Sequence, residues 1–267
     1  MTPRWSVPFP FAGLVAALLL LGSAATTRAT EPALPAAPVA PAELAVLQQK
    51  LGDLAHPLVW VMTGDSITHG AKWLGNERSY PELIQERVRW SLKRRRDLFV
   101  NSGISGERTT GLLADFDWRV LHFKPDIVSI MIGMNNAVLG PDGRKPFEAD
   151  LREMIRQVRA AGAIPILHRT NPIDLETPRP AGSDNASAMA RADVPAYNEI
   201  IATVARELDV ILVDHWTHWQ TAKPTPADLR AWLADPIHPN GAGHRQFSIE
   251  FFRTIGCYDP TAPDCQP

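Results

Sequence analysis

The chain has 267 residues, of which 45% are hydrophobic and 21% are charged, and its formal net charge is −2. This composition is typical of one sizeable soluble domain, and it gives no indication of a nucleic-acid-binding or membrane-surface protein. The one basic run, residues 93–96, follows an amphipathic stretch. We therefore expect it at the carboxyl end of a helix, where cations oppose the helix dipole.

Residues 1–30 have the features of a secretory signal peptide. Arg4 lies near the start, an apolar segment covers residues 11–22, and small residues follow it. The apolar segment is shorter than the roughly 20 residues that a membrane-spanning helix requires. No cysteine follows it directly, which argues against a lipid anchor. We expect export, to the periplasm or out of the cell, with no stable membrane span after the signal is removed.

After the signal, residues 31–42 consist mainly of proline, alanine and valine, which favours an extended linker over packed structure. The globular domain is expected to cover residues 43–256. Short apolar runs in it alternate with stretches of helical periodicity, a pattern typical of parallel strands joined by crossover helices. The runs predict strands at Leu58–Thr63, Leu98–Asn101, Ile127–Ile132, Ile164–His168 and Val210–Asp214. The periodic stretches predict helices at Tyr80–Lys93, Thr109–His122, Pro146–Ala161, Val194–Leu208 and Gly241–Ile255.

This order of elements predicts an α/β fold, a three-layer α/β/α sandwich around a five-stranded parallel sheet. The tail, residues 257–267, contains the only two cysteines, Cys257 and Cys265. An exported chain meets an oxidising compartment, so we expect a disulfide to close the tail. The sequence contains neither of the common glycine-rich phosphate-binding motifs, and we expect no cofactor.

Polar residues that follow the strands are the candidates for chemistry, because ligands of open parallel sheets bind at the carboxyl ends of the strands. Ser66 ends the first strand in a tight turn, Gly64-Asp65-Ser66, and is a candidate nucleophile. A serine hydroxyl needs a base, and Asp235-Pro236-Ile237-His238 offers one near the other end of the chain. In this interpretation His238 is the base, and Asp235 orients its ring.

Two further segments offer hydrogen-bond donors to a negatively charged oxygen. Gly106 follows the second strand, and Asn135 follows the third in Gly133-Met134-Asn135-Asn136. Fixed donors at an oxyanion are worth about 2.7 to 4 kcal/mol each. The backbone N–H groups of Ser66 and Gly106 and the amide of Asn135 therefore predict an oxyanion hole, although a turn glycine and a helix-capping asparagine would look the same alone.

Four other residues compete for roles in this site. His244 could be the base but falls inside the last predicted helix, and Asp214 could be the orienting acid. His215 and His218 have a spacing that suggests a metal site, yet no third ligand or metal-binding motif accompanies them, so we expect no metal.

Together these segments resemble the SGNH, or GDSL-type, hydrolase family, over a stretch from Gly64 to His238. The resemblance implies the flavodoxin-like sheet of the SGNH fold, with the nucleophile at Ser66, oxyanion donors at Gly106 and Asn135, and a catalytic Asp235 and His238. Two positions depart from the family pattern. Ile67 replaces the usual leucine, and Asn136 replaces a common aspartate, which affects local hydrogen bonding more than the mechanism.

The resemblance implies an exported serine esterase that cleaves carboxylic esters through an acyl-enzyme. The expected substrate is a small-molecule or glycan ester, because Trp73, Trp216, Trp219 and Trp232 lie in or near the loops of the site and could stack on a sugar ring. A short-chain, acetyl-removing carbohydrate esterase is therefore our leading hypothesis. A lipase or lysophospholipase, and a non-catalytic carbohydrate-binding member of the fold, are the alternatives. The long polar segment 171–195 follows the fourth strand at the same edge, and loops of this length are often lids or specificity elements.

Overall fold

The structure is a computed structural model that describes residues 41–70, 72–176 and 185–266. The predicted signal peptide and most of the predicted linker lie outside the described residues. The described residues belong to one compact unit.

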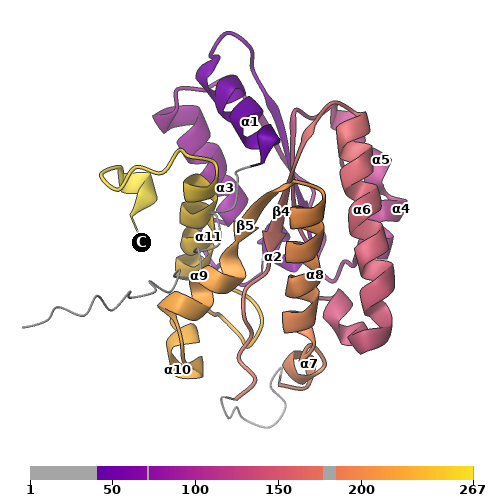
Figure 1. Cartoon of the computed structure of the whole chain (residues 1–267). Helices are drawn as coiled ribbons and strands as arrows, with labels where there is room; N and C mark the ends of the chain where they lie inside the picture. Colours follow the sequence, from indigo (N-terminus) through magenta and orange to yellow (C-terminus); the bar gives the residue numbers. More distant parts are fainter. Residues whose placement is uncertain (1–40, 71, 177–184, 267) are drawn as a thin grey trace, which may run out of the picture. The chain divides into compact units, whose positions relative to one another are not determined.

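The centre of this unit is a five-stranded parallel sheet with the strand order β2-β1-β3-β4-β5 (Figure 1). The expectation of a parallel sheet is confirmed, and each bound lies within one residue of the prediction. β1, β3 and β4 are buried almost throughout, because helices cover both faces and leave no side of these strands to water. The strands are β1 Val59–Gly64, β2 Leu98–Asn101, β3 Ile127–Met131, β4 Ile164–Arg169 and β5 Ile211–Asp214.

Helices form a layer on each side of the sheet, which confirms the predicted three-layer α/β/α architecture (Figure 1). α6 (Arg144–Ala160) and α8 (Val194–Glu207) pack together on one face, and α3 (Tyr80–Glu86) and α11 (Gly241–Thr254) pack together on the other. The other α-helices are α1 Ala42–Gly52, α2 Ser66–His69, α4 Thr109–Ala114, α5 Phe116–Arg119, α7 Asn185–Met189, α9 His215–Ala222 and α10 Pro226–Leu229. The other helical segments are a π-helix at Arg87–Ser91 and 3₁₀-helices at Leu121–Phe123, Asn136–Gly143 and Pro263–Cys265.

Two predicted helices are interrupted. The helix expected at Tyr80–Lys93 changes into a π-helix after Glu86, and the one expected at Thr109–His122 breaks at Asp115, whose backbone leaves the helical region. The helices α1, α2, α7, α9 and α10 were not predicted. No helix in the described ranges is long and apolar enough to span a membrane.

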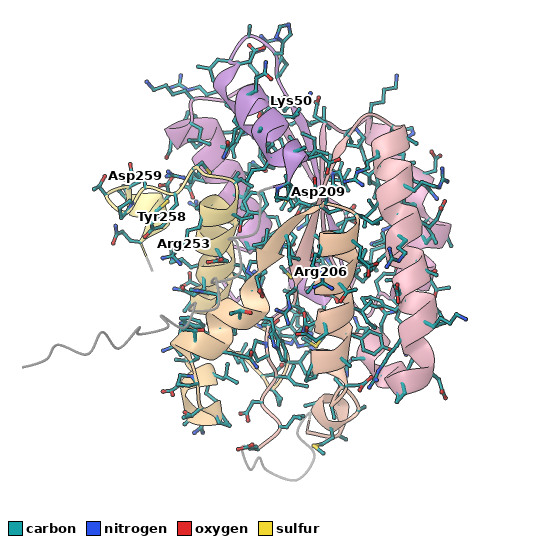
Figure 2. All side chains as sticks on the ribbon, viewed as in Figure 1. Lys50, Arg206, Asp209, Arg253, Tyr258 and Asp259 are labelled. Atoms are coloured by element: carbon teal, nitrogen blue, oxygen red, sulfur yellow. The ribbon has the colours of Figure 1, made fainter. Side chains whose placement is uncertain are left out.

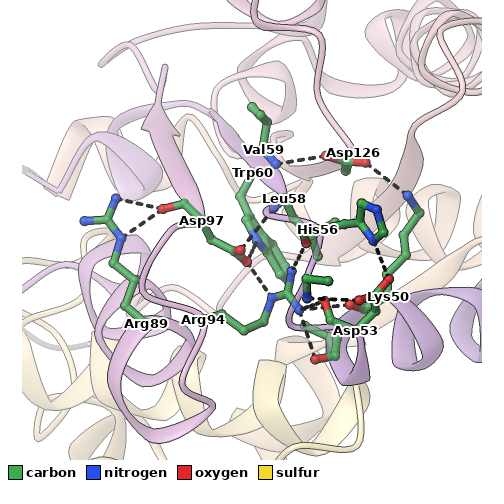
Figure 3. Close-up of polar contacts among 12 residues, drawn as sticks. Lys50, Asp53, His56, Leu58, Val59, Trp60, Arg89, Arg94, Asp97 and Asp126 are labelled. Carbon is green, nitrogen blue, oxygen red and sulfur yellow. Dashed lines mark hydrogen bonds and ion pairs between the residues drawn. The ribbon is translucent and has the colours of Figure 1, made fainter.

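The basic run at residues 93–96 anchors the amino-terminal edge of the sheet through Arg94, which is 3% exposed (Figure 3). Its guanidinium pairs with the Asp97 carboxylate and donates to the backbone carbonyls of Lys50, Leu51, Asp53 and His56. These carbonyls lie at and just beyond the carboxyl end of α1, where unpaired acceptors need donors. The run thus lies directly after the helical segment that ends at Ser91, as expected, and its Arg94 also serves the carboxyl end of α1.

The carboxyl-terminal tail is held by arginines. Arg87 donates to the carbonyl of Cys257 and pairs with Asp264, and the Arg253 guanidinium lies 4.7 Å from the centre of the Tyr258 ring (Figure 2). The disulfide expected between Cys257 and Cys265 is absent from this structure, in which both are free thiols. Burial raises the pKa of the Cys257 thiol to about 12, and Arg87 holds the tail through its contacts with the Cys257 carbonyl and Asp264.

Candidate active site

Ser66 is the first residue of α2, immediately beyond the carboxyl end of β1. Asp65 caps this short helix, because its Oδ1 accepts a hydrogen bond of 3.0 Å from the backbone N–H of Ile67. Gly64 precedes them with a φ of 154°, and a Cβ at that position would lie 2.0 Å from the carbonyl oxygen of Met131 on β3. Only glycine allows this approach of the two strands, which presents Ser66 at the sheet edge.

The structure brings His238 and Asp235 to Ser66 from a segment that lies far away in the sequence. The distance from Ser66 Oγ to His238 Nε2 is 3.0 Å, and the distance from His238 Nδ1 to Asp235 Oδ2 is 2.8 Å. All three side chains are largely buried. This is the relay of nucleophile, base and orienting acid that a serine hydrolase requires, with hydrogen-bond contact at both steps.

The loop that carries His238 is fixed by its own backbone and by the segment after β4. The carbonyl of His238 accepts from the N–H of Ala234 at 2.8 Å. Asn171 Nδ2 donates to the carbonyl of Ile237 at 3.0 Å, and the N–H of Asp174 donates to the carbonyl of Pro236 at 2.8 Å. The base is thus held by contacts from outside its own loop, which limits its movement relative to Ser66.

The two carboxyl groups beside Ser66 lie in different electrostatic environments. Burial alone would raise the pKa of Asp235, but hydrogen bonds from the His238 ring and from the backbone N–H groups of His238 and Ile237 outweigh it and lower the pKa. Asp235 is therefore ionised and suited to orient an imidazolium. Burial raises the pKa of Asp65 to about 7, so this carboxyl is only partly ionised at neutral pH.

Asn135 follows β3 and is 6% exposed. Its Nδ2 donates to the carbonyl of Glu107 at 3.0 Å, and its Oδ1 accepts from Arg191 Nη2 at 2.7 Å. Gly106, in the turn just before Glu107, has a φ of 84° and no heavy atom within 4 Å of the place where a Cβ would sit. Asn135 is therefore tied to the turn that contains Gly106, as a shared oxyanion hole requires.

Arg119 connects the same turn to the serine turn. This arginine is 2% exposed, and it pairs with the Glu107 carboxylate and donates to the carbonyls of Gly64 and Ser102. The segments after β1 and β2 are therefore held at a fixed separation by one buried side chain.

Asn136, which stands where the family commonly has aspartate, keeps local hydrogen bonding intact. Its Oδ1 accepts from the backbone N–H of Thr109 at 3.2 Å, and its Nδ2 donates to Thr109 Oγ1 at 2.9 Å. Thr109 Oγ1 in turn donates to Asp150 at 2.7 Å. The amide thus satisfies both groups at the start of α4 and replaces the carboxylate without an unpaired atom.

The residues that competed for the roles of base, orienting acid and metal ligand have other partners in the structure. His244 is buried between α11 and α3, where its Nδ1 accepts from the N–H of Tyr80. Asp214 caps α9 and pairs with Arg169. His215 contacts His168 in the core, whereas His218 contacts Gln246 and Glu250, and residues 41–70, 72–176 and 185–266 contain no cluster of three or more potential metal ligands.

The tryptophans divide between core and site. The Trp73 ring stacks on the imidazole of His238, with ring centroids 3.5 Å apart and planes inclined by 11°. Trp219 is fully buried, and Trp232 packs edge-on against it. Trp216 is partly buried against the core. Trp73 is therefore the tryptophan that contacts a candidate catalytic side chain directly.

Three contacts of the site could not be anticipated from sequence patterns. They are the ring stacking of Trp73 on His238, the bridge made by Arg119, and the hydrogen bond from Arg191 to Asn135. Arg191 lies in the second half of the predicted lid segment 171–195, just beyond α7, while residues 177–184 fall outside the described part. Arg119 and Arg191 lie outside any recognisable motif. Their roles come from tertiary contacts, which the local sequence does not report.

Comparisons with known proteins agree with this geometry. A family model, the GDSL-like lipase/acylhydrolase family, matches residues 62–246. An uncharacterized lipoprotein of Bacillus subtilis (strain 168), YqeF, is 30% identical over 205 residues, which cover 68% of this chain and 84% of the relative. An acetylxylan esterase of Geobacillus stearothermophilus is 32% identical over 163 residues, which cover 59% of this chain and 71% of that enzyme.

Solved structures show the same fold. LAE5, an alpha/beta hydrolase enzyme from the metagenome of Lake Arreo in Spain, is 25% identical, with a TM-score of 0.57 and coverage of 77% of this chain and 99% of its own. Axe2, an acetylxylan esterase from Geobacillus stearothermophilus, is 24% identical, with a TM-score of 0.58 and coverage of 74% and 94%. The family match spans most of the chain, including the serine turn at its start. The chain belongs to the GDSL-like lipase/acylhydrolase family and is a carboxylic ester hydrolase.

Proposed function

We propose that this protein is an exported serine esterase that removes acetyl groups from carbohydrate, with Ser66 as nucleophile, His238 as general base and acid, and Asp235 as the orienting carboxylate. The observation that carries the proposal is the unbroken contact from Ser66 Oγ to His238 and from His238 to Asp235, at 3.0 and 2.8 Å.

Acylation starts when Ser66 Oγ attacks the carbonyl carbon of the ester and its proton passes to His238 Nε2. Asp235 accepts a hydrogen bond from the opposite ring nitrogen, which fixes the tautomer and stabilises the imidazolium. The tetrahedral intermediate collapses as the bond to the alcohol oxygen breaks, and His238 returns the proton to that oxygen. Water then repeats the sequence on the acyl-enzyme, so acetate leaves and Ser66 recovers its proton.

The negative charge on the carbonyl oxygen needs donors that are in place before the reaction. We assign this role to the N–H groups of Ser66 and Gly106 and to the amide of Asn135. The Asn135 amide has two N–H donors, one of which is used by the carbonyl of Glu107, so the second is available to the substrate. Each such donor is worth about 2.7 to 4 kcal/mol in acyl transfer.

Two observations support a short acyl group on a sugar. The acetylxylan esterase relative is 32% identical to this chain over 163 residues. Trp73 stacks on His238 and is partly exposed, so a sugar that carries the ester can contact its ring. Flat aromatic rings are suited to stacking on sugar faces. Export is supported by the composition of residues 1–30 and by the lipoprotein relative.

The test is to measure acetate release from acetylated xylooligosaccharides and initial rates on p-nitrophenyl esters with two to sixteen acyl carbons. The mature protein is compared with Ser66→Ala and with Ser248→Ala, a control that removes a buried serine of α11 whose hydroxyl donates to the carbonyl of Arg245. We expect acetate release and a short-chain preference that vanish in Ser66→Ala and persist in Ser248→Ala.

Other outcomes separate the alternatives. A preference for long acyl chains would replace the carbohydrate esterase with a lipase. Binding of acetylated oligosaccharide with no turnover on any ester would favour a non-catalytic member of the fold. Full activity in Ser66→Ala would refute the assignment of the nucleophile.

A further inference from the structure

Arg191 makes contacts that its position outside every sequence motif does not suggest. It lies in the turn between α7 and α8, and its Nη1 donates to the carbonyl and the Oγ of Ser187, both at 2.7 Å. Its Nη2 donates to Asn135 Oδ1, also at 2.7 Å. One end of the guanidinium is therefore anchored on α7, and the other reaches across to the proposed oxyanion hole.

This contact determines which way the Asn135 amide faces. A side-chain amide can present either its oxygen or its nitrogen in a given direction, and the two orientations are nearly equal in shape. Arg191 has only N–H donors, so it donates to the amide oxygen and cannot form a hydrogen bond with the amide nitrogen. The carbonyl of Glu107 holds one N–H of Nδ2 at 3.0 Å, and the remaining N–H is left for the substrate oxygen.

The charge of Arg191 lies among the ionisable groups of the site. Burial lowers the pKa of Arg191, and the positive charge of Arg108 acts in the same direction, while attraction to Asp65 and Asp235 opposes both. A hydrogen bond from a charged guanidinium is about twice as strong as one between neutral groups. The bond to Asn135 is thus strong, and the cation that makes it stands close to where an oxyanion would form.

We infer that Arg191 is a positioning residue of the oxyanion hole, which holds the Asn135 amide with its N–H toward the substrate carbonyl oxygen. The inference deepens the proposed function and depends on the role proposed there for Asn135. Arg191 itself is not required to touch the substrate. Its removal is therefore expected to slow the chemical step without weakening substrate binding.

The experiment is a double-mutant cycle on p-nitrophenyl acetate, with kcat and KM measured for Arg191→Met, Asn135→Ala and the double variant. Asn135→Ala should lower kcat about 100-fold to 1,000-fold, as the loss of an oxyanion donor does in acyl transfer. Arg191→Met should lower kcat by about 10-fold or more with KM within about threefold, since a misoriented amide loses part of that stabilisation. In the Asn135→Ala background, Arg191→Met should have almost no further effect, because the residue through which it acts is gone.

Arg144→Met is the matched control, since Arg144 pairs with Asp193 in the same turn as Arg191 and is not among the hydrogen-bond partners of Asn135. It should leave kcat close to the wild-type value. Arg191→Lys keeps the charge but cannot hold Ser187 and Asn135 with the same planar fork, so its kcat should fall between those of the wild type and Arg191→Met. Should Arg191→Met fail to fold, as judged by circular dichroism, the same cycle is run with Arg191→Lys.

The results that overturn the inference are distinct from those that overturn the proposed function. A rise in KM at constant kcat in Arg191→Met would make Arg191 a substrate-binding residue. An equal loss in both backgrounds, or an equal loss in Arg144→Met, would mean that Arg191 only stabilises its turn. Wild-type kcat in Asn135→Ala would instead refute the proposed oxyanion hole.

Discussion

Acidification from pH 7 to pH 5 should destabilise this fold by about 4 kcal/mol, because three histidines are buried in it as neutral rings. His168, His215 and His244 are each at most 2% exposed. His168 Nε2 lies 2.7 Å from Ser129 Oγ, and its Nδ1 lies 2.9 Å from His215 Nε2. His244 Nδ1 accepts from the N–H of Tyr80, which requires an unprotonated nitrogen.

Burial lowers the pKa of His168 and of His244 from 6.5 to about 3. Burial also lowers the pKa of His215 well below 6.5, and repulsion from the neighbouring histidines adds to this. The unfolded chain therefore binds more protons than the native protein between pH 6.5 and pH 3. The contribution of these neutral histidines to the free energy of unfolding is therefore fully present above pH 6.5, and it is lost as the pH falls from 6.5 toward 3.

The magnitude follows from the same linkage. Each histidine contributes about 2 kcal/mol of destabilisation between pH 7 and pH 5, or about 6 kcal/mol for the three. Asp65 acts in the opposite direction, because burial raises its pKa to about 7 and the native protein takes up a proton there as the pH falls. That uptake offsets about 2 kcal/mol, which leaves the net loss of about 4 kcal/mol.

The assay is urea-induced unfolding at pH 7 and pH 5, followed by circular dichroism. His244→Asn is the informative variant, because an asparagine oxygen can still accept from the N–H of Tyr80 but does not titrate. The loss of stability between the two pH values should shrink by about 2 kcal/mol in this variant. Equal stability of the wild type at both pH values, or an unchanged pH dependence in His244→Asn, would refute the reasoning.

Three further predictions concern the site. Gly103→Ala should lower both the melting temperature and kcat at least several-fold, because the new Cβ would lie 2.6 Å from the backbone nitrogen of His69 and displace the helix that carries the serine; thermal unfolding and kinetics that match the wild type would contradict this. Trp73→Ala should reduce kcat/KM on p-nitrophenyl acetate about fivefold, which corresponds to the roughly 1 kcal/mol of an aromatic stacking contact, because the imidazole of His238 loses its planar support; an unchanged kcat/KM would show that the stacking does not contribute to catalysis. Asp235→Asn should reduce kcat by about 10,000-fold with little change in KM, since the amide favours the wrong tautomer of the base, and a loss below tenfold in steady-state kinetics would remove Asp235 from the relay.

The sheet could be predicted closely because parallel strands covered on both faces are continuous apolar runs with sharp polar ends. Helices were predicted less well. α9 was missed because its sequence, His215–Ala222, is rich in aromatic and β-branched residues of modest helix propensity, and the helix depends on the Asp214 cap. The break at Asp115 in the segment Thr109–His122 is accompanied by tertiary contacts of Arg119, which no local pattern reports.

In the candidate site too, residues in short motifs could be predicted, whereas residues that act through tertiary contacts could not. Ser66, Asp235 and His238 could be proposed from sequence because each lies in a short motif, and the structure places them in hydrogen-bond contact. Arg191 could not be proposed, because it meets Asn135 across 56 positions of the chain through a turn with no characteristic sequence. The disulfide expected between Cys257 and Cys265 stays a prediction, because the spacing of two cysteines and the redox compartment do not by themselves fix the bonding geometry.

The most direct test of the central claim is to label the protein with diethyl p-nitrophenyl phosphate and to locate the adduct by peptide mass spectrometry. Ser66 Oγ should form a bond to phosphorus as p-nitrophenolate leaves, and esterase activity should fall in step with one diethylphosphoryl group per chain. Ser66→Ala should take up no label. Complete inhibition of the wild type with the label on another residue, or inhibition and labelling that persist in Ser66→Ala, would contradict the assignment of Ser66 as the nucleophile.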